Sequence, residues 1–529
     1  MVKINIRLNI NYSTEDIYSA VCECLPVSRE EIRGVEIIRR SLNLSDKPRF
    51  FYDLTVALSF SEEREVGLLK MKKKVSAYTE PRLTLNKTHT LLNPVVVGAG
   101  PAGLFAALTL AEAGASPILL ERGLPVDDRR ASVFNFTDSR KLDTESNIQY
   151  GEGGAGTFSD GKLKVGAMDK YKYKVLSEFV LAGADEDIMF SVGAHLGTDR
   201  LSSIVKIIRE KIISLGGRVI FSARVDEITV KDGRVRGVGY STPTGREYIE
   251  TDNVIMATGH SARDSFELLL SLGTALEPRP FGIGVRLEHK REDINRLIYG
   301  ENYPDTLGAA SYHLVTHLAG GRSVYSFCMC PGGTVVAAAN ERGGIVTNGM
   351  SEYRRDGENS NAAILVSVTP DDFESDSPLA GLDLQRKIER QAFTAAGSDY
   401  SAPASTLGDF LERREPKGFS SVIPTYPVGV VPVSLDRVLP EYICDALRAG
   451  TRDFDDWLRG YSMPEAVMTA PETRTTSPVR ILRDDSLEAL GIKGLYPAGE
   501  GAGYSGGIVS SARDGIMVAE RLLLNNTTT

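Results

Sequence analysis

Residues 95–122, VVVGAGPAGLFAALTLAEAGASPILLER, constrain the fold of this chain more than any other segment. The apolar run Pro94–Val97 is typical of a strand buried on both faces, and Leu104–Ala113 predicts a helix of small residues soon after it. The turn between them has the spacing GxGxxG and consists of Gly98, Ala99, Gly100, Pro101, Ala102 and Gly103. In such a turn the first glycine permits a tight bend, the second lets a pyrophosphate approach, and the third allows close helix–strand contact. The segment therefore predicts an α/β domain that binds a dinucleotide at a helix N-terminus.

The strand that follows this helix ends in an acidic residue. Pro117–Leu120 reads as a second buried strand, and Glu121 lies 121 − 98 = 23 residues after Gly98. A carboxylate at this place can accept hydrogen bonds from the two hydroxyls of a ribose. Arg122 could pair with a 2′-phosphate, but Glu121 itself favours a ribose without phosphate at that position.

Three further glycine-rich segments favour FAD over NAD. The first, GEGGAGTFSDGK at 151–162, can wrap closely around a large ligand and contains Gly154 and Lys162. The second, NVIMATG at 253–259, reads as a strand that ends in a turn at Thr258 and Gly259. The third, GLYPAGEGAGYSGGI at 494–508, reads as a strand, a glycine loop and the start of a helix. No second GxGxxG stands between a strand and a helix, so NAD(P)H, as a possible reductant, would dock only transiently.

The composition of the 529 residues excludes several classes of protein. Hydrophobic residues make up 42% and charged residues 25%, so a mostly disordered or fibrous chain is excluded. The formal net charge of -9 leaves no broad basic footprint for nucleic acid. The N-terminus lacks the apolar core of a signal peptide, and glycines and prolines interrupt each long uncharged stretch, so we expect no membrane association. Five cysteines without regular spacing favour a reducing compartment, and we predict a cytoplasmic location.

The order of predicted elements divides the chain into four segments and gives an α/β fold class. Residues 1–85 predict a small N-terminal α+β domain with a helix capped near Ser13. Residues 90–280 and 470–525 hold the glycine clusters and predict the two parts of a split, Rossmann-like FAD-binding domain. Residues 281–469 predict a mixed α/β substrate or cap domain inserted between these parts.

The segment before the second glycine turn predicts a run of strands. We expect them at Arg218–Val230, Val235–Tyr240 and Tyr248–Ala257, with a hairpin at 231–233.

Six long motifs resemble those of a known family. They are RRSL (39–42), QYGEGGAGTFSDGKL (149–163), RPFGIGVRLEH (279–289), YSFCMCPGG (325–333), ETRTTSPVRI (472–481) and LYPAGEGAGYSGGIVSSARDG (495–515). With them the sequence resembles the glutathione-reductase-like, two-dinucleotide-binding-domain flavoprotein superfamily, and more closely its bacterial family of uncharacterised FAD-dependent (NAD(FAD)-utilising) dehydrogenases. The resemblance covers nearly the whole chain and implies an FAD cofactor, but this family has no assigned substrate.

The resemblance also implies roles for single residues. Glu500, where many relatives have Asp, would contact the ribityl or pyrophosphate part of FAD. The helix that begins near Gly506, Gly507 and Ile508 would direct its N–H groups at the flavin pyrimidine edge. The backbone of Val225 would form hydrogen bonds with the adenine. The complete set of predicted FAD-binding residues is Gly98, Ala99, Gly100, Pro101, Ala102, Gly103, Glu121, Arg122, Gly154, Val225, Thr258, Gly259, Gly499, Glu500, Gly506, Gly507 and Ile508.

Two cysteines in a predicted strand are candidates for redox chemistry. Cys328 and Cys330 are two residues apart, so a regular strand would place both on one face. Buried thiols that pack against the flavin domain are the favoured interpretation, and a redox or nucleophilic role is the alternative. No His or Cys stands in an attachment context beside the flavin motifs, so we expect non-covalent FAD.

The remaining catalytic candidates are basic residues. Arg286 and Arg474 lie where the chain is expected to enter and leave the cap, and each could bind an anionic substrate or bridge two domains structurally. Lys162 is the last residue of the first glycine-rich segment, 151–162. His313 and His317 have helical metal-ligand spacing but no third ligand nearby, so no metal is predicted. His260 follows the Thr258–Gly259 turn and could lie near the flavin or at the surface.

The function predicted from these features is an FAD-dependent oxidoreductase that transfers a hydride between flavin N5 and a small-molecule substrate. Arg286 and Arg474 would suit an anionic substrate. Two alternatives stay open: a flavin-bound scaffold that recruits a partner, and a flavin-dependent enzyme that modifies nucleic acid, which the acidic composition disfavours. The sequence contains no feature that indicates an oligomeric state.

Overall fold

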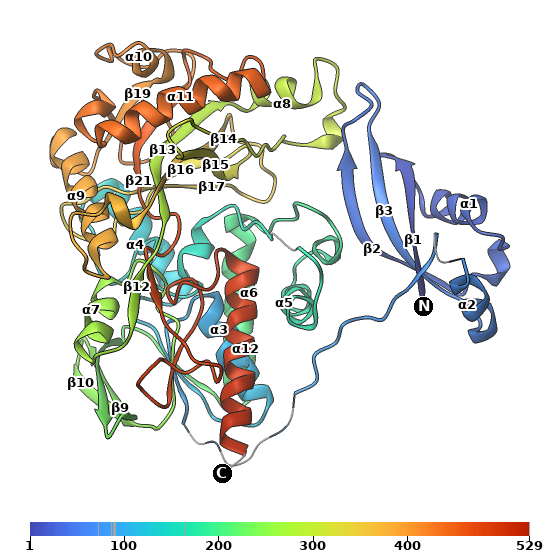
Figure 1. The fold of residues 1–529 in the computed structure, drawn as a ribbon, viewed down its shortest axis with the longest axis horizontal. Coiled ribbons are helices and arrows are strands. Elements are labelled where there is room, and N and C mark those ends of the chain that lie inside the picture. The colour runs from blue at the N-terminus through green and yellow to red at the C-terminus, as the bar shows by residue number, and fades with distance from the viewer. Residues whose placement is uncertain (72–73, 86, 88–90, 92, 164–165, 528–529) are drawn as a thin grey trace.

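The computed structural model describes residues 1–71, 74–85, 87, 91, 93–163 and 166–527. Five short parallel strands form a central sheet in the order β23-β11-β5-β6-β7 (Figure 1). Their bounds are Val95–Val97 (β5), Ile118–Leu120 (β6), Arg218–Ile220 (β7), Val254–Met256 (β11) and Leu495–Pro497 (β23). Every residue of β5, β6, β11 and β23 is buried, as expected for parallel strands covered on both faces.

The helix that follows the first strand of this sheet in the sequence packs against the helix that follows the last one. Helix α3 (Pro101–Glu112) packs against α12 (Ile508–Thr527) and also contacts α6 (Gly197–Ser214). The helices α3 and α12 approach closely, because a Cβ atom at Gly515 would lie only 2.0 Å from the carbonyl oxygen of Ala102. This packing places the third glycine-rich segment, 494–508, which leads into α12, beside the dinucleotide turn at 98–103.

A three-stranded antiparallel sheet follows α6 in the sequence. Two of the strands that the sequence predicts in this region are each divided between two sheets. The three-stranded sheet consists of β8 (Arg224–Lys231), β9 (Arg234–Thr242) and β10 (Gly245–Glu250), joined by the expected hairpin. The strand expected at Arg218–Val230 is interrupted at Ser222, which has φ +51°, so β7 joins the parallel sheet and β8 does not. The strand expected at Tyr248–Ala257 is likewise divided between β10 and β11, which lie in different sheets.

The segment after β12 (Leu276–Pro278) builds a seven-stranded sheet in the order β14-β15-β18-β13-β21-β19-β20. Its strands are β13 (Phe281–Lys290), β14 (Val315–His317), β15 (Ser323–Cys330), β18 (Asn359–Val368), β19 (Ala402–Thr406), β20 (Val430–Pro432) and β21 (Val467–Glu472). Helices α8 (Arg291–Tyr299), α9 (Ala380–Ala395) and α11 (Glu441–Trp457) pack against it. Nine of the ten residues of β13 are buried, because the sheet is covered on both faces.

Two strand pairs and four helices complete these parts. The strand β12 pairs with β22 (Val479–Ile481), so the chain leaves and re-enters the parallel-sheet part at neighbouring positions. The hairpin of β16 (Thr334–Ala337) and β17 (Thr347–Met350) lies beside the seven-stranded sheet. The remaining α-helices of this region are α4 (Val126–Ser139), α5 (Lys170–Leu181), α7 (Arg263–Ser271) and α10 (Leu407–Leu411).

The N-terminal residues form a separate four-stranded sheet in the order β2-β3-β1-β4. The elements are β1 (Val2–Asn9), α1 (Thr14–Cys24), β2 (Gly34–Asn43), β3 (Phe51–Ser59), α2 (Glu62–Leu69) and β4 (Ser76–Ala77). This β-α-β-β-α-β order with antiparallel pairing is the split βαβ arrangement. Ser13 caps α1 by accepting the N–H of Asp16, as the sequence predicts.

The N-terminal sheet touches both larger parts of the molecule. Arg40 of β2 pairs through its backbone with Phe190 and Val192 in the segment before α6. On the other side, Phe50 packs edge-on against Tyr299 of α8, with ring centroids 6.2 Å apart.

The architecture confirms the predicted fold class: a parallel, Rossmann-like dinucleotide-binding sheet, a mixed α/β part and a small N-terminal α+β part. None of the described helices combines the length and the apolar character that crossing a bilayer requires.

Candidate functional site

A cavity of about 280 Å³ lies where the carboxyl ends of the parallel strands meet the seven-stranded sheet. Fifteen of the seventeen predicted FAD-binding residues line it; the two that do not are Ala99 and Gly103. Side chains from β15, β17 and the end of β21 form its far wall. The site therefore joins residues that are more than 400 positions apart in the sequence.

The dinucleotide turn has the geometry that its glycines predict. Gly98 has φ +99°, and a Cβ atom there would lie 2.5 Å from the carbonyl oxygen of Ala257. Gly103 must lack a side chain because its Cβ would lie 1.8 Å from the carbonyl oxygen of Gly98. At Gly100 the nearest atom to a Cβ is 3.9 Å away, so the space beside it is open. Gly100 also begins α3 without a side-chain cap, which leaves N–H groups of the first turn for a phosphate.

Glu121 links this turn to the glycine loop at 151–156. Its carboxylate accepts hydrogen bonds from the N–H groups of Ala99 at 2.7 Å, Gly123 at 2.9 Å and Gly151 at 2.9 Å. A carboxylate has about four acceptor positions, so one is left for a ribose hydroxyl. Ala99 thus contributes to the site through its backbone, although it does not line the cavity.

The adenosine end of the predicted site is bordered by Arg122 and Val225. The Arg122 guanidinium lies over the Tyr150 ring, 4.2 Å from its centroid, and forms ion pairs with Glu145 and Asp264. Val225 lies at an irregularity of β8, where the pairing with β9 shifts register. Such a bulge leaves backbone groups without partners in the ladder, which suits hydrogen bonding to a base edge.

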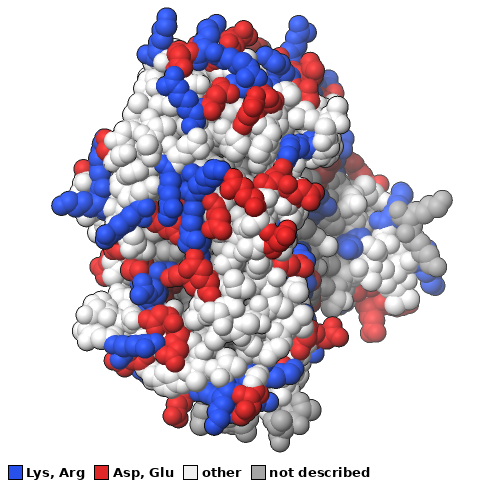
Figure 2. All heavy atoms as spheres, turned by 60° about the vertical axis from the view of Figure 1, so that its left-hand side comes forward, with Lys and Arg blue, Asp and Glu red and all other residues white. Residues whose placement is uncertain are grey.

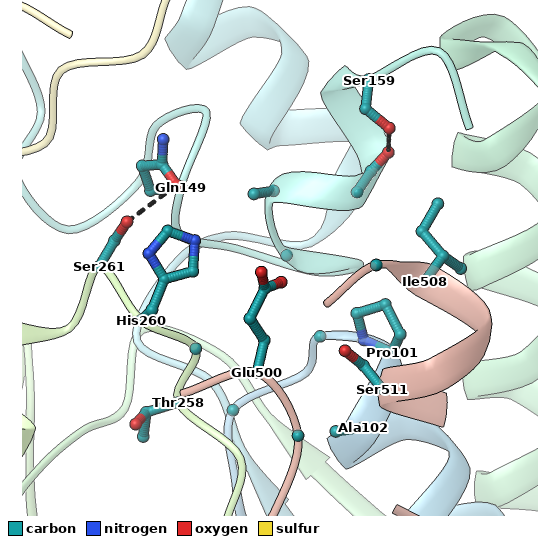
Figure 3. A pocket seen from close by; sticks show the side chains of 18 of the residues that line it. Pro101, Ala102, Gln149, Ser159, Thr258, His260, Ser261, Glu500, Ile508 and Ser511 are labelled. Carbon is teal, nitrogen blue, oxygen red and sulfur yellow. Dashed lines mark hydrogen bonds between the residues drawn. The ribbon is translucent and has the colours of Figure 1, made fainter. Parts of the chain in front are cut away.

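The third glycine-rich segment, 494–508, brings an acidic side chain into the cavity. In Figure 3 the Glu500 side chain points toward the space between His260 and the start of α12. Burial raises the pKa of Glu500 to about 7, and the nearby N–H of Gly507 opposes that shift. Gly507 has φ +120°, and a Cβ atom there would meet nothing within 4 Å.

Asp514 holds this loop in place, a role that the sequence pattern did not reveal. Its carboxylate accepts the N–H of Gly499 at 2.7 Å and pairs with Arg483 at 3.1 Å. The partner Arg483 lies outside the glycine motifs, so the sequence spacing contains no signal for the contact.

The cysteine pair differs from the expectation that both thiols share one face. Cys330 is buried, whereas Cys328 is exposed and lines the cavity. The pairing of β15 with β18 shifts register between Phe327 and Cys330, and Cys328 has φ +40°. This bulge adds one residue to the strand and therefore breaks the alternation of faces. The thiol of Cys330 donates to the carbonyl oxygen of Cys328 at 3.2 Å, and burial raises its pKa to about 12.

Arg286 is fully buried behind the wall and does not line the cavity. Its guanidinium donates to Glu472 at 2.5 and 3.2 Å, to the carbonyl oxygen of Cys328 at 2.9 Å and to Asn348 at 3.0 Å. These bonds occupy all three of its nitrogens, so Arg286 positions the bulge and leaves no donor for a substrate in this geometry.

Lys162 lines the cavity opposite these residues. Its ammonium group donates to the carbonyl oxygen of Met329, next to Cys328. Burial lowers the pKa of Lys162, and the neighbouring Asp160 opposes that shift. Asp160 itself is bound by Arg355 and Ser351, so it does not neutralise Lys162 alone.

His260 lies near Gln149 and Ser261 at the side of the cavity (Figure 3). Arg474 lines the same cavity. Arg474 donates from Nε and Nη2 to the two oxygens of Glu389, both at 2.9 Å. Burial, together with Arg474 and Arg263, lowers the pKa of His260 to about 3, so its imidazole is neutral near pH 7.

The structure identifies further residues that shape the glycine loop. Arg129 is fully buried and donates to the carbonyl oxygens of Asn147, Ile148, Glu152 and Gly154. These contacts hold the loop around the cavity. They join residues about twenty positions apart without any periodic pattern, so the sequence did not predict them.

The other histidine candidates lie away from the cavity. His317 ends β14 and His313 precedes that strand, so their spacing is not that of a helix. Across the part of the chain that the structure describes, no three His, Cys, Asp or Glu side chains are grouped so that they could hold a metal ion.

Comparisons with known proteins agree with the geometry. Residues 280–475 match the family described as "FAD-dependent protein, C-terminal domain-like", and residues 93–134 match the family described as "FAD binding domain". A protein of Clostridium beijerinckii, described as an uncharacterised protein, is 42% identical over 535 residues, which cover 99% of this chain and 98% of that protein.

Solved structures of flavoproteins resemble the chain more distantly. A Cytophaga hutchinsonii flavoprotein/dehydrogenase is 12% identical with a TM-score of 0.37, covering 82% of this chain and 78% of its own. The FrdA chain of Escherichia coli quinol fumarate reductase is 15% identical with a TM-score of 0.36, covering 83% and 72%.

Proposed function

This chain belongs to a bacterial family of FAD-dependent oxidoreductases, and we propose that it transfers a hydride between flavin N5 and a small-molecule substrate. The substrate would lie between the flavin and the segment 281–469, which we propose as the substrate domain. Five cysteines, none in a disulfide, support a proposed cytoplasmic location.

The cavity fits its FAD cofactor at the positions where the ligand must approach the backbone. A Cβ atom would meet nothing within 4 Å at Gly259 and Gly507, and only one atom at Gly100. At Gly98, Gly103 and Gly501, in contrast, a Cβ atom would clash with backbone atoms. The uncapped N-terminus of α3 supplies N–H donors for the phosphates. When bound, FAD supplies a site at N5 that accepts or donates a hydride.

The observation that carries the proposal is the extent of the cavity. It does not end at the dinucleotide residues but continues to Phe327, Cys328 and Asn348 on β15 and β17. A site that only stored FAD would need no such second wall. A wall built from another sheet offers room and side chains for a substrate beside the flavin.

The chain's own groups have distinct proposed tasks. The N–H groups at the start of α12 would stabilise negative charge at the pyrimidine edge of the flavin. Lys162, whose pKa burial lowers, would exchange a proton with the substrate. Arg286 would keep the Cys328 bulge in its place.

The surface supports a small-molecule substrate rather than a polyanion. Figure 2 shows basic and acidic side chains interspersed over the face it presents, instead of one broad basic field. The formal net charge of -9 points the same way.

Anaerobic mixing tests the proposal. The FAD-loaded protein would be combined with NADH, NADPH and a metabolite library while the visible absorbance of the flavin is followed. Bleaching by one donor, and its reversal by an oxidised metabolite, are the expected results. A flavin that none of these compounds reduces, although dithionite does, would contradict the proposal.

A further inference from the structure

Thirteen buried side-chain atoms in the described residues lack a hydrogen-bond partner, and only two of them belong to residues that line the cavity. They are Nη1 of Arg474 and Nδ1 of His260. Buried polar atoms without a partner are rare and costly in native proteins, so each needs an explanation. Because these two atoms belong to residues that line the same cavity, one bound ligand could supply the missing hydrogen-bond partner of both.

The contacts of Arg474 leave one of its hydrogen-bond donors, Nη1, without a partner. Glu389 binds its Nε and Nη2 atoms, and only 4% of the Arg474 surface is exposed. Arg286, the other buried arginine at this wall, has partners for all of its nitrogens and does not line the cavity. Four other arginines of the described chain, Arg64, Arg263, Arg480 and Arg483, also have a buried nitrogen without a partner, but none of them lines the cavity. The free Nη1 of Arg474 is therefore distinguished by its place on the cavity.

The charged groups around Arg474 and His260, which we call the Arg474 corner of the cavity, favour the binding of an anion. Glu389 is shared between Arg263 and Arg474, and Arg263 also pairs with Glu341. Among the described residues, Glu389 is therefore the one carboxylate that pairs directly with Arg474. Burial alone would raise the pKa of Glu389, but the two arginines hold it at about 2. Burial lowers the pKa of His260, and the charges of the same two arginines lower it further.

The phosphates of FAD have their own place in the cavity. They belong at the start of α3, where Gly100 leaves open space and the helix has no side-chain cap. Arg474, in contrast, follows β21 of the seven-stranded sheet and lies two residues after Glu472 in the far wall. An anion at Arg474 would thus come from the second ligand.

We infer that Arg474 and His260 form a subsite for the carboxylate group of an organic-acid substrate. The guanidinium Nη1 donates one charge-assisted hydrogen bond, and the neutral imidazole contributes a second contact. This inference rests on the proposed function, since it names the class of the substrate that the flavin would oxidise or reduce.

The test uses FAD-loaded protein and malonate, succinate and inorganic phosphate as probes. Each probe is titrated while the visible spectrum of the bound flavin is recorded, which requires no turnover. We expect a saturable change with a dicarboxylate. Replacing Arg474→Lys keeps a charge for Glu389 but removes Nη1, and His260→Leu removes both ring nitrogens. Each should weaken carboxylate binding about tenfold or more, with FAD content unchanged.

Arg386→Met is the matched control. Arg386 belongs to the same ion-pair network through Glu341 but does not line the cavity, so this variant should bind the probes like the wild type. Loss of FAD from Arg474→Lys and His260→Leu would show that the corner serves the cofactor instead. No spectral change with any carboxylate, or a change with phosphate alone, would also overturn the inference. Carboxylate binding to a flavin that no donor reduces would reject the proposed hydride transfer and leave the subsite standing.

Discussion

At the scale of single residues, the cavity contains groups whose properties depend on burial rather than on sequence context. Glu500 and Cys330 have raised pKa values, and His260 and Lys162 have lowered ones, each because burial disfavours the charged form. The sequence motifs named all four as candidate residues, and all four line the cavity. The motifs contained no information on which would be charged.

The open space beside Gly100 predicts that Gly100→Val removes FAD. The chain itself tolerates a Cβ there, since the nearest atom is 3.9 Å away, but a branched side chain would fill the approach of the pyrophosphate. We expect FAD affinity to fall by roughly a hundredfold or more. The measurement is flavin per protein after purification. Gly67→Val is the matched control, because Gly67 lies on α2 with nothing within 4 Å, and it should keep full flavin.

The raised pKa of Glu500 predicts a pH dependence of FAD binding to the apoprotein. The ordinary pKa of 4.5 becomes about 7, so the carboxyl is mostly neutral at pH 6 and mostly charged at pH 8. Burial disfavours the charged form of Glu500, and that form also repels the phosphates, so affinity should fall roughly tenfold between these two pH values. Fluorescence titration with FAD measures it. Glu500→Gln should show a flat profile, and a wild-type affinity that rises with pH would reject the assignment.

The bulge at Cys328 predicts unequal thiol reactivity and no flavin-coupled disulfide. In the apoprotein, Cys328 should react with a maleimide about tenfold or more faster than the buried Cys330. Mass spectrometry of digested protein measures this. Because Cys330 stays a thiol, reductive titration should consume two electrons per flavin in both the wild type and Cys330→Ser. Four electrons in the wild type and two in the variant would instead indicate a dithiol–disulfide enzyme.

At the scale of elements, turns with local causes were predicted and those with distant causes were not. The glycine turn before α3 and the hairpin between β8 and β9 were predicted, because each depends on residues adjacent in sequence. The bulge of β15 was not predicted, because Arg286 and Lys162, which donate hydrogen bonds to its carbonyl groups, lie far away in the sequence. Likewise, nothing local distinguishes β10 from β11, which join different sheets.

At the scale of the whole molecule, the N-terminal part touches two other parts but contributes nothing described to the cavity. Arg40 pairs with Phe190 and Val192, and Phe50 packs on Tyr299, whereas no residue of 1–85 lines the site. It is therefore placed to steady the arrangement of the molecule rather than to hold FAD.

A chain that begins at Leu85 should accordingly keep its flavin. We expect an unchanged ratio of FAD to protein, together with a thermal midpoint lower by a few degrees because the contacts of Arg40 and Phe50 are lost. Absorbance and differential scanning calorimetry measure the two quantities. A soluble but colourless truncated protein would show that the N-terminal part is required for the cofactor site.

The central claim is hydride transfer at the flavin, and rapid anaerobic mixing with a donor deuterated at the reacting carbon tests it most directly. NADH and NADPH labelled at C4 are the first donors, followed by organic acids labelled at the carbon next to the carboxylate. We predict that one donor bleaches the flavin in a single turnover, that deuterium slows the bleaching severalfold, and that the donor loses its label. Bleaching without loss of the label, or no bleaching by any donor, would contradict the account.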